Sequence, residues 1–172
     1  ADGTEESYHV ACGNFRMSEF VGAILLSQIS RVREQTEARW ANGEYLAEEL
    51  AKIDGVSALK RDPRITKRGY YFYFVRYDAS AWNGVSRDRF MEALRAEGVS
   101  CGTAHNDPVY EYAAFKDMPA RQGIQVDCPE AERVYQTEVV ALGKDFLMYR
   151  ENIDAVVGAI RKLRENVDDI AD

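Results

Sequence analysis

Hydrophobic residues first recur at helical spacing between residues 17 and 51, which predicts one long helix. The positions on its apolar stripe are Phe20, Ala23, Ile24 and Ser27 near its start, and Leu46, Leu50 and Ile53 near its end. Ser18 is a suitable N-cap, because its hydroxyl can accept a hydrogen bond from the first turn. The Asn42-Gly43 pair predicts a bend or an interruption in this helix.

Short hydrophobic runs predict four strands, at residues 55–60, 70–77, 99–102 and 138–142. The clearest is "YYFYFVRY" at 70–77, in which both faces are apolar. A strand with two apolar faces is typical of a strand that is covered on both sides. We therefore expect residues 70–77 to form a central strand.

Two further amphipathic segments predict helices. Ser86 is the expected N-cap of a helix that runs to Glu97, with Gly98 at its C-terminal end. We expect its inward side chains to be Phe90, Ala93 and Leu94. The other segment is C-terminal, and its stripe consists of Ile153, Val156, Val157, Ile160, Leu163 and Val167.

The order of these elements predicts an α+β fold, in which a long N-terminal helix and further helices pack on a small, largely antiparallel sheet. Residues 104–137 lack a sustained period, and a connection of that length is usually functional or partly helical. We see no linker and no repeat, so residues 1–172 are expected to form one domain. Its parts are an entry loop (1–16), the long helix (17–51) and an α/β region (55–172).

Composition and charge narrow the class of protein. Apolar residues make up 46% and charged residues 30% of the chain, which are globular values. The net charge of -7 argues against binding to nucleic acid or to an anionic membrane, since such proteins are usually basic. The chain has no apolar run of the ~20 residues that span a membrane, and its acidic start is not a secretory signal.

The cysteines and histidines leave two readings open. An odd set of widely spaced cysteines (Cys12, Cys101 and Cys128) does not suggest a disulfide framework, so a cytoplasmic location is expected. His9 and Cys12, together with Cys101 and His105, could form a zinc site. However, neither pair is a C-x-x-C motif, and free cysteine is commonly a small core residue.

The stretch "GNFRMSEF" at residues 13–20 combines several features of an anion-binding corner. Gly13 permits close approach of a ligand, the amide of Asn14 can donate a hydrogen bond, and Arg16 adds a permanent charge. A helix begins directly afterwards and exposes free N–H groups, which suits a phosphate. The alternative is an ordinary Gly-Asn turn before a capped helix. The chain lacks the G-x-S-x-G, P-loop and G-x-G-x-x-G motifs.

The same stretch resembles part of the DegT/DnrJ/EryC1/StrS family of fold-type-I sugar aminotransferases, which depend on pyridoxal phosphate. The residues that carry the resemblance include "GNFRMSEFVGAILLSQISRV", "SRDRFMEALRAEGVSC", "DPVYEYAAF" and "CPEAERVYQTEVVAL". It covers nearly the whole chain from about Tyr8. Among branches, the chain is most similar to the scyllo-inosose (aminocyclitol) and 3-amino-5-hydroxybenzoate enzymes, and the expected fold is the small C-terminal domain of that family.

The resemblance implies roles for particular residues. In the family, the asparagine of this motif contacts the cofactor phosphate in the neighbouring subunit, so Asn14 would do so here, with Gly13 and Arg16 beside it. His105 and Tyr110 would line the substrate pocket. The alternatives are that Arg16 only pairs with an acid such as Glu19, and that His105 only orders its loop.

The chain also departs from the family pattern. The segment "VVALGK" stands where relatives often carry an aromatic residue and histidines, which puts substrate contacts of Ala141, Gly143 and Lys144 in doubt. No lysine has the sequence context of the family's Schiff-base lysine; the lysines are Lys52, Lys60, Lys67, Lys116, Lys144 and Lys162. We therefore expect no catalytic residue in this chain, and no activity unless another polypeptide supplies that amine.

The implied partners are a second copy of the chain or a complementing N-terminal large domain, and a keto-sugar or keto-cyclitol substrate that receives an amino group from glutamine or glutamate. The implied cofactor is pyridoxal 5'-phosphate, with no metal. The alternative is a non-catalytic module, derived from the same family, that dimerises or binds a small molecule.

Overall fold

The computed structural model describes residues 16–103, 108–112, 115, 122–143 and 145–171. The chain divides into two compact units, residues 1–34 and residues 35–172, and each is described by itself. The helix α1 (Glu19–Leu50) begins in the first unit and ends in the second. The predicted long helix is therefore confirmed to within two residues at its ends.

The first unit contains the start of α1 and its cap. The Oγ atom of Ser18 accepts a hydrogen bond from the backbone N–H of Val21 at 3.3 Å, which confirms the predicted N-cap. The large hydrophobic side chains on this half of the helix are exposed; Phe20, for example, has 85% of its surface accessible. The apolar stripe near the start of α1 is thus not buried by the described residues of this unit.

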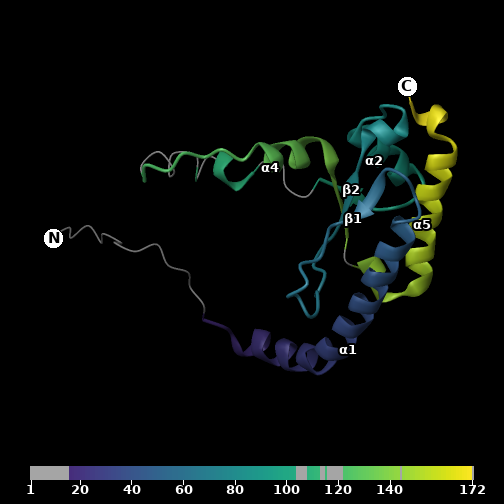
Figure 1. Cartoon of the computed structure of the whole chain (residues 1–172). Coiled ribbons are helices and arrows are strands. Elements are labelled where there is room, and N and C mark those ends of the chain that lie inside the picture. Colours follow the sequence, from purple (N-terminus) through teal and green to yellow (C-terminus); the bar gives the residue numbers. More distant parts are fainter. Residues whose placement is uncertain (1–15, 104–107, 113–114, 116–121, 144, 172) are drawn as a thin grey trace, which may run out of the picture. The chain divides into compact units, whose positions relative to one another are not determined.

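The second unit contains a four-stranded sheet (Figure 1). Its strands are β1 (Val56–Ala58), β2 (Tyr73–Tyr77), β3 (Cys101–Gly102) and β4 (Val139–Leu142). The order is β1-β2-β4-β3, and every neighbouring pair is antiparallel. The predicted antiparallel sheet and the central place of β2 are confirmed.

The core lies on one face of this sheet. Tyr73, Val75 and Tyr77 of β2 are buried there, because alternate residues of a strand point to the same face. The second half of α1, the helix α2 (Arg87–Ala96) and the helix α5 (Arg150–Glu165) contribute most of the other core side chains. They include Leu46, Leu50, Phe90, Leu94, Ile153, Val157 and Ile160.

The opposite face of β2 is less covered than its sequence predicts. Phe72, just before the strand, is 43% exposed, Phe74 is partly buried, and Arg76 is exposed. The prediction that both faces of this strand are covered is therefore wrong for the described part of the chain. Arg76 gives the physical reason, since a guanidinium on this face favours contact with water or with a carboxylate.

The predicted interruption of α1 at Asn42 and Gly43 is also wrong, because the helix continues through both residues; the alternative, a bend, stays a prediction. The side-chain amide of Asn42 donates to the carbonyl oxygen of Leu147 at 2.8 Å, so this polar group has a tertiary partner. Gly43 is buried in the helix under the ring of Tyr70. Both residues thus serve packing within the helix rather than ending it.

The predicted caps and stripes of the other helices are confirmed. Ser86 accepts a hydrogen bond from the N–H of Arg89 at 3.2 Å, and Gly98, which follows α2, has a φ of +87°. The apolar stripe of α5 is buried. Val167 is buried too, but it lies beyond α5 in the short 3-10 turn η5 (Val167–Ile170).

The long connection between β3 and β4 is partly helical, as expected. It contains a 3-10 turn, η2 (Val109–Glu111), a short helix, α4 (Pro129–Arg133), and a π-helical turn, η3 (Val134–Glu138). Two more 3-10 turns follow β2 and β4, namely η1 (Ala79–Trp82) and η4 (Asp145–Met148). The turn η2 and the helix α4 carry two residues of the site described next.

Candidate functional site

Three of the five predicted site residues (Gly13, Asn14 and His105) lie outside the described residues. Arg16 is described: it is exposed and precedes the first residue of α1 by three positions. The start of α1 therefore combines a guanidinium with the free N–H groups of a helix N-terminus, one of which Ser18 already occupies. This arrangement fits one side of a phosphate.

Tyr110, the fifth predicted residue, lies in η2 and is partly buried. Its hydroxyl donates a hydrogen bond to Oε1 of Glu132, in α4, at 3.1 Å. Burial and this bond to a carboxylate raise the pKa of Tyr110 to about 12. The hydroxyl consequently stays protonated to higher pH than an ordinary tyrosine, and its oxygen can accept a further hydrogen bond.

Sequence reasoning missed Glu132. It stands in a run of charged residues, "PEAER", in which nothing distinguishes an acid that pairs with a residue 22 positions away. Only the fold of the connection between β3 and β4 brings it to Tyr110.

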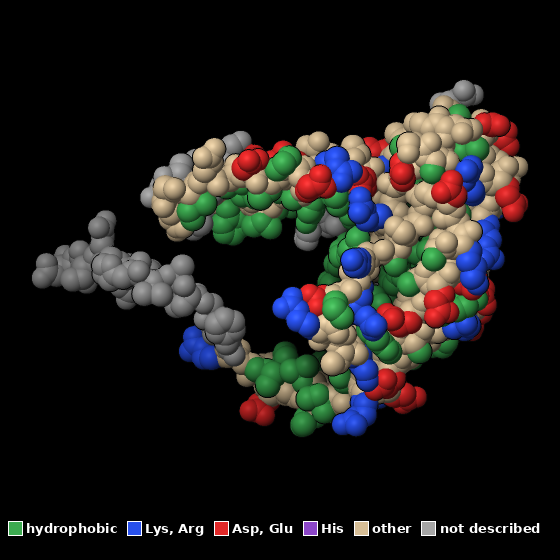
Figure 2. Space-filling model, viewed as in Figure 1, with side chains coloured by type: hydrophobic (Ala, Val, Ile, Leu, Met, Phe, Trp, Pro, Cys, Tyr) green, Lys and Arg blue, Asp and Glu red, His purple; other side chains and the backbone are tan. Residues whose placement is uncertain are grey.

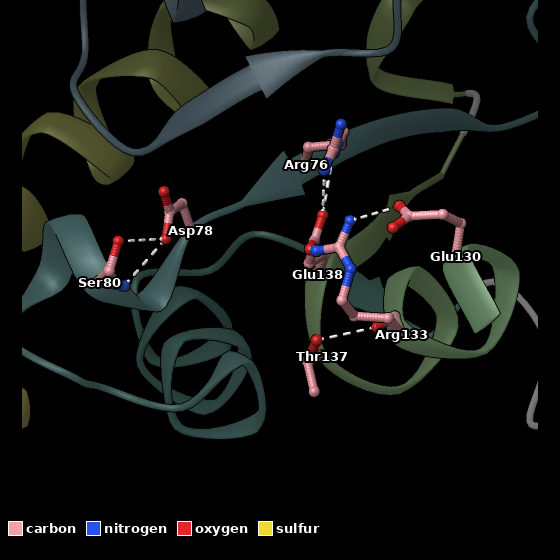
Figure 3. Close-up of polar contacts among 7 residues, drawn as sticks. All are labelled: Arg76, Asp78, Ser80, Glu130, Arg133, Thr137 and Glu138. Carbon is pink, nitrogen blue, oxygen red and sulfur yellow. Dashed lines mark hydrogen bonds and ion pairs between the residues drawn. The ribbon is translucent and has the colours of Figure 1, made fainter.

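A cluster of charges, the Glu138 clamp, ties the end of this connection to the sheet. It consists of Arg76 in β2, Arg133 in α4 and Glu138 at the end of η3 (Figure 3). The carboxylate of Glu138 accepts from Nε of Arg76 at 3.0 Å and also forms an ion pair with Arg133. Because the Glu138 side chain is only 13% exposed, this pairing is better shielded from water than a surface ion pair.

A second arginine, Arg87, holds the turn η3 in place. Arg87, at the start of α2, is 9% exposed, and its Nη1 donates to the carbonyl oxygen of Tyr135 in η3 at 2.5 Å. Its Nε donates to Oδ1 of Asp88 at 3.1 Å, so the buried charge is compensated. The clamp and Arg87 together fix η3, and with it the adjoining helix α4 that carries Glu132.

A hollow of about 380 Å³ lies beside the clamp. Its charged lining residues are Arg76, Arg133, Asp78 and Glu138, two of each sign. Asp78 accepts hydrogen bonds from the backbone and the side chain of Ser80 (Figure 3), which lower its pKa. The positive and negative side chains that line this hollow balance one another. The hollow therefore suits a structural role better than the binding of an ion.

The described residues contain no group of three or more His, Cys, Asp and Glu side chains that could hold a metal ion. Cys101 is half-buried, with its Sγ 3.5 Å from the carbonyl oxygen of Met91, and Cys128 is exposed. The zinc hypothesis also involves His9, Cys12 and His105, which lie outside the described residues, so it stays untested. In the described part of the chain, no helix has the length and apolar character needed to cross a membrane.

The described lysines do not suit covalent attachment of a cofactor, which usually requires a desolvated amine in a pocket. Lys52 pairs with Glu49 at 2.5 Å, Lys162 pairs with Glu97 at 2.7 Å, and both are exposed. Lys67 is exposed and pairs with Glu37, and Lys60 is exposed on the loop that follows β1. Lys116 and Lys144 lie outside the described residues.

The fold is similar to part of several solved aminotransferases. One is 3-amino-5-hydroxybenzoic acid synthase, which aligns over 96% of this chain and 43% of its own, with a TM-score of 0.68 and 23% identity. Another is an aminotransferase of Psychrobacter cryohalolentis, with a TM-score of 0.71 and 22% identity over 98% of this chain and 44% of its own. The described fold is thus that of a portion of a fold-type-I aminotransferase.

The sequence comparisons define the class further. A profile of the DegT/DnrJ/EryC1/StrS aminotransferase family matches residues 2–161, and the chain belongs to this family. A protein of Micromonospora echinospora, provisionally named L-glutamine:3-amino-2,3-dideoxy-scyllo-inosose aminotransferase, is 33% identical over an alignment of 168 positions, which covers 90% of this chain and 40% of that protein. The L-glutamine:scyllo-inosose aminotransferase of Streptomyces griseus is 26% identical over 97% of this chain and 42% of its own length. The chain therefore spans about 40% of the length of these curated relatives.

Proposed function

We propose that this chain is the C-terminal segment of a pyridoxal-phosphate-dependent aminotransferase. The proposed reaction transfers an amino group from glutamine or glutamate to a keto-sugar or keto-cyclitol. Family membership supports the reaction class, and the names of the Micromonospora and Streptomyces relatives support a keto-cyclitol and glutamine. The segment would contribute Asn14 and Arg16 to an active site that it shares with another polypeptide.

One observation carries this proposal. A stretch of sequence suited to binding an anion is followed directly by a helix whose apolar side chains are exposed. Arg16 directly precedes the half of α1 on which the large hydrophobic side chains are between 45% and 85% exposed (Figure 2). They are Phe20, Val21, Ile24, Leu25, Leu26, Ile29 and Val32. A helix that is apolar over most of its circumference is usually buried on several sides. We infer that a second copy of the chain, or a large domain, covers it and so receives the residues that precede it.

The residues at this corner fit the phosphate of the cofactor, but the described lysines do not fit its covalent attachment. Asn14 and Gly13 would offer an amide donor and room for close approach, and Arg16 with the start of α1 would balance the phosphate charge. When bound, pyridoxal phosphate supplies the group that accepts the amine from the donor and passes it to the ketone. The amine that anchors the cofactor would lie outside residues 1–172, so we expect no activity from these residues alone.

His105 and Tyr110 are the proposed substrate contacts. The hydroxyl of Tyr110 donates to Glu132, which leaves an oxygen lone pair to accept a hydrogen bond from a substrate hydroxyl. A polyhydroxylated ring offers several such donors. Tyr110 would therefore orient the substrate through an uncharged hydroxyl.

The exposed apolar half of α1 also favours a second candidate function, a non-catalytic module that dimerises or binds a small molecule. Such a module would use the same surface for association without completing an active site. It differs from the first proposal in one respect, since no partner polypeptide would restore turnover.

Complementation tests the proposal. The chain is co-expressed with the upstream portion of the Streptomyces griseus relative, the complex is purified, and amination of scyllo-inosose with glutamine is measured. We expect turnover from the complex, little or none from either part alone, and a strong loss with Asn14→Ala. A complex that forms and binds cofactor but gives no turnover would favour the non-catalytic module.

A further inference from the structure

A cleft of about 730 Å³ lies between the second half of α1, the strand β1 and residues 59–72, which connect β1 to β2. We call it the hairpin cleft. Its volume lies within the range of ~300–1,000 Å³ that is typical of small-molecule sites. Its floor includes small apolar side chains, Ala47 and Ala51 of α1 and Ala58 of β1. None of its residues is among those by which the aminotransferase function is proposed.

One wall of the hairpin cleft is fixed by Tyr70. Its ring stacks on Tyr73 with centroids 5.3 Å apart and on Trp40 at 6.3 Å. Its hydroxyl donates to Oε1 of Glu44 at 3.1 Å. Tyr70 adopts a left-handed φ of +47°, which costs a residue with a side chain of the order of 1 kcal/mol. The contacts of its ring and hydroxyl offset this strain and hold the hairpin in one position.

The charges that line the hairpin cleft are mostly positive (Figure 2 shows Lys and Arg side chains over this hairpin). Arg61 lies 3.5 Å from the carboxylate of Glu44. Arg68 instead donates to two backbone carbonyl oxygens, of Leu59 at 3.3 Å and of Lys60 at 3.1 Å. Within the described part of the chain, neither Lys60 nor Arg68 forms an ion pair with a carboxylate. Three cations thus face one anion, in a chain whose net charge is -7.

An aromatic wall completes the cleft. Tyr71 is 70% and Phe72 is 43% exposed, and their rings meet edge to face at 4.7 Å. Neither residue belongs to the buried core cluster. Two exposed aromatic rings held beside unneutralised cations form a surface on which the face of a ring can stack while an anionic group reaches the cations.

We propose that the hairpin cleft binds a small ring compound that carries a phosphate or carboxylate group. The ring packs against Tyr71 and Phe72, and the anionic group pairs with Lys60 and Arg68. Glu44 remains available to accept a hydrogen bond from a hydroxyl of the ligand. Three features support this assignment together: the volume, the surplus of positive charge and the exposed aromatic pair.

Calorimetric titration of the purified chain with phenyl phosphate tests the proposal. We expect saturable binding that weakens as salt is added, because screening acts on the charge pairs. Lys60→Glu should weaken binding roughly five- to tenfold, since it replaces an attraction by a repulsion near the surface. Phe72→Ala should weaken binding of phenyl phosphate but not that of inorganic phosphate. The matched control is Lys52→Glu, which reverses an exposed charge outside the cleft and should leave the affinity unchanged.

Circular dichroism of each variant checks that it is folded before its affinity is compared. The proposal is overturned if the chain shows no saturable binding, or if Lys60→Glu and Lys52→Glu weaken it equally. Equal affinity for phenyl phosphate and inorganic phosphate would also contradict it, because the aromatic wall would then contribute nothing. The complementation experiment with Asn14→Ala does not depend on ligand binding in the hairpin cleft. The proposed aminotransferase function and the proposed ligand site can therefore fail separately.

Discussion

The ring of Tyr70 packs directly over Gly43, in the middle of the second half of α1. A Cβ atom placed on Gly43 would lie 2.5 Å from Cε2 of Tyr70, far inside van der Waals contact. The same glycine accepts, at its carbonyl oxygen, a hydrogen bond of 3.1 Å from the buried hydroxyl of Tyr73. Gly43 is therefore the point at which the helix, the hairpin and the central strand β2 meet.

Gly43→Ala should destabilise the second unit even though alanine favours helices. The added methyl group must displace the Tyr70 ring, and overpacking of this kind costs about 1–3 kcal/mol. The matched control is Gly22→Ala in the same helix, where the nearest atom, Cε of Met17, is 3.9 Å from the new Cβ. The control should stabilise the helix by about 0.5–1 kcal/mol. Chemical denaturation measures both; equal stabilisation by the two substitutions would contradict the packing described here.

The Glu138 clamp should contribute measurably to stability. Glu138→Ala removes the shared partner of Arg76 and Arg133, and we expect a loss of about 1–2 kcal/mol, because hydrogen bonds to charged groups exceed neutral ones. Glu130 pairs with Arg133 as well, but its side chain is 82% exposed. Glu130→Ala should cost less than about 0.5 kcal/mol. If the two variants unfold at the same urea concentration, the clamp has no special role.

High pH should weaken the fold through Tyr110. Its pKa is raised from 10.0 to about 12, by burial first and by its bond to Glu132 second. Because the pKa is higher in the folded state, the stabilisation that protonated Tyr110 gives to the fold is complete below pH 10. It is lost between about pH 10 and 12. The free energy of unfolding should therefore fall over that range, and fall less in Tyr110→Phe. Tyr149→Phe, which changes an exposed tyrosine, is the control and should match the wild type.

Much of the fold could be predicted because its signals are local. Ser86 and Gly98 bound α2 through hydrogen bonding and backbone conformation within a few residues, and the stripe of α5 needs only its own period. The incorrect prediction of an interruption in α1 depended on distant partners. Asn42 and Gly43 resemble a break in the helix until Leu147 and Tyr70 are placed against them.

Less of the candidate site than of the fold could be predicted from the sequence alone. Tyr110 could be singled out by family resemblance, but its partner Glu132 could not, because the pairing depends on the path of the chain between β3 and β4. The same holds for Arg87, which reads as an ordinary surface residue at a helix start, yet is nearly buried against the carbonyl oxygen of Tyr135. Contacts between residues tens of positions apart leave no periodic signal.

Asn14→Ala should weaken cofactor binding in the complemented enzyme. Loss of one hydrogen bond to a charged phosphate costs about 1.5–3 kcal/mol, which is roughly a 10- to 100-fold increase in Kd. Asn152→Ala, on the exposed side of α5, is the matched control and should leave Kd unchanged. Fluorescence titration with pyridoxal phosphate reports both values; an unchanged Kd in Asn14→Ala would remove this residue from the proposed site.

The central claim is that residues 1–172 do not contain the amine that holds the cofactor. The most direct measurement is borohydride reduction of the purified 172-residue chain with pyridoxal phosphate, followed by mass spectrometry of the intact protein and of its peptides. We predict no stoichiometric addition of a pyridoxyl group, and only trace labelling spread over the exposed lysines. One pyridoxyl group per chain on a single lysine would contradict the claim.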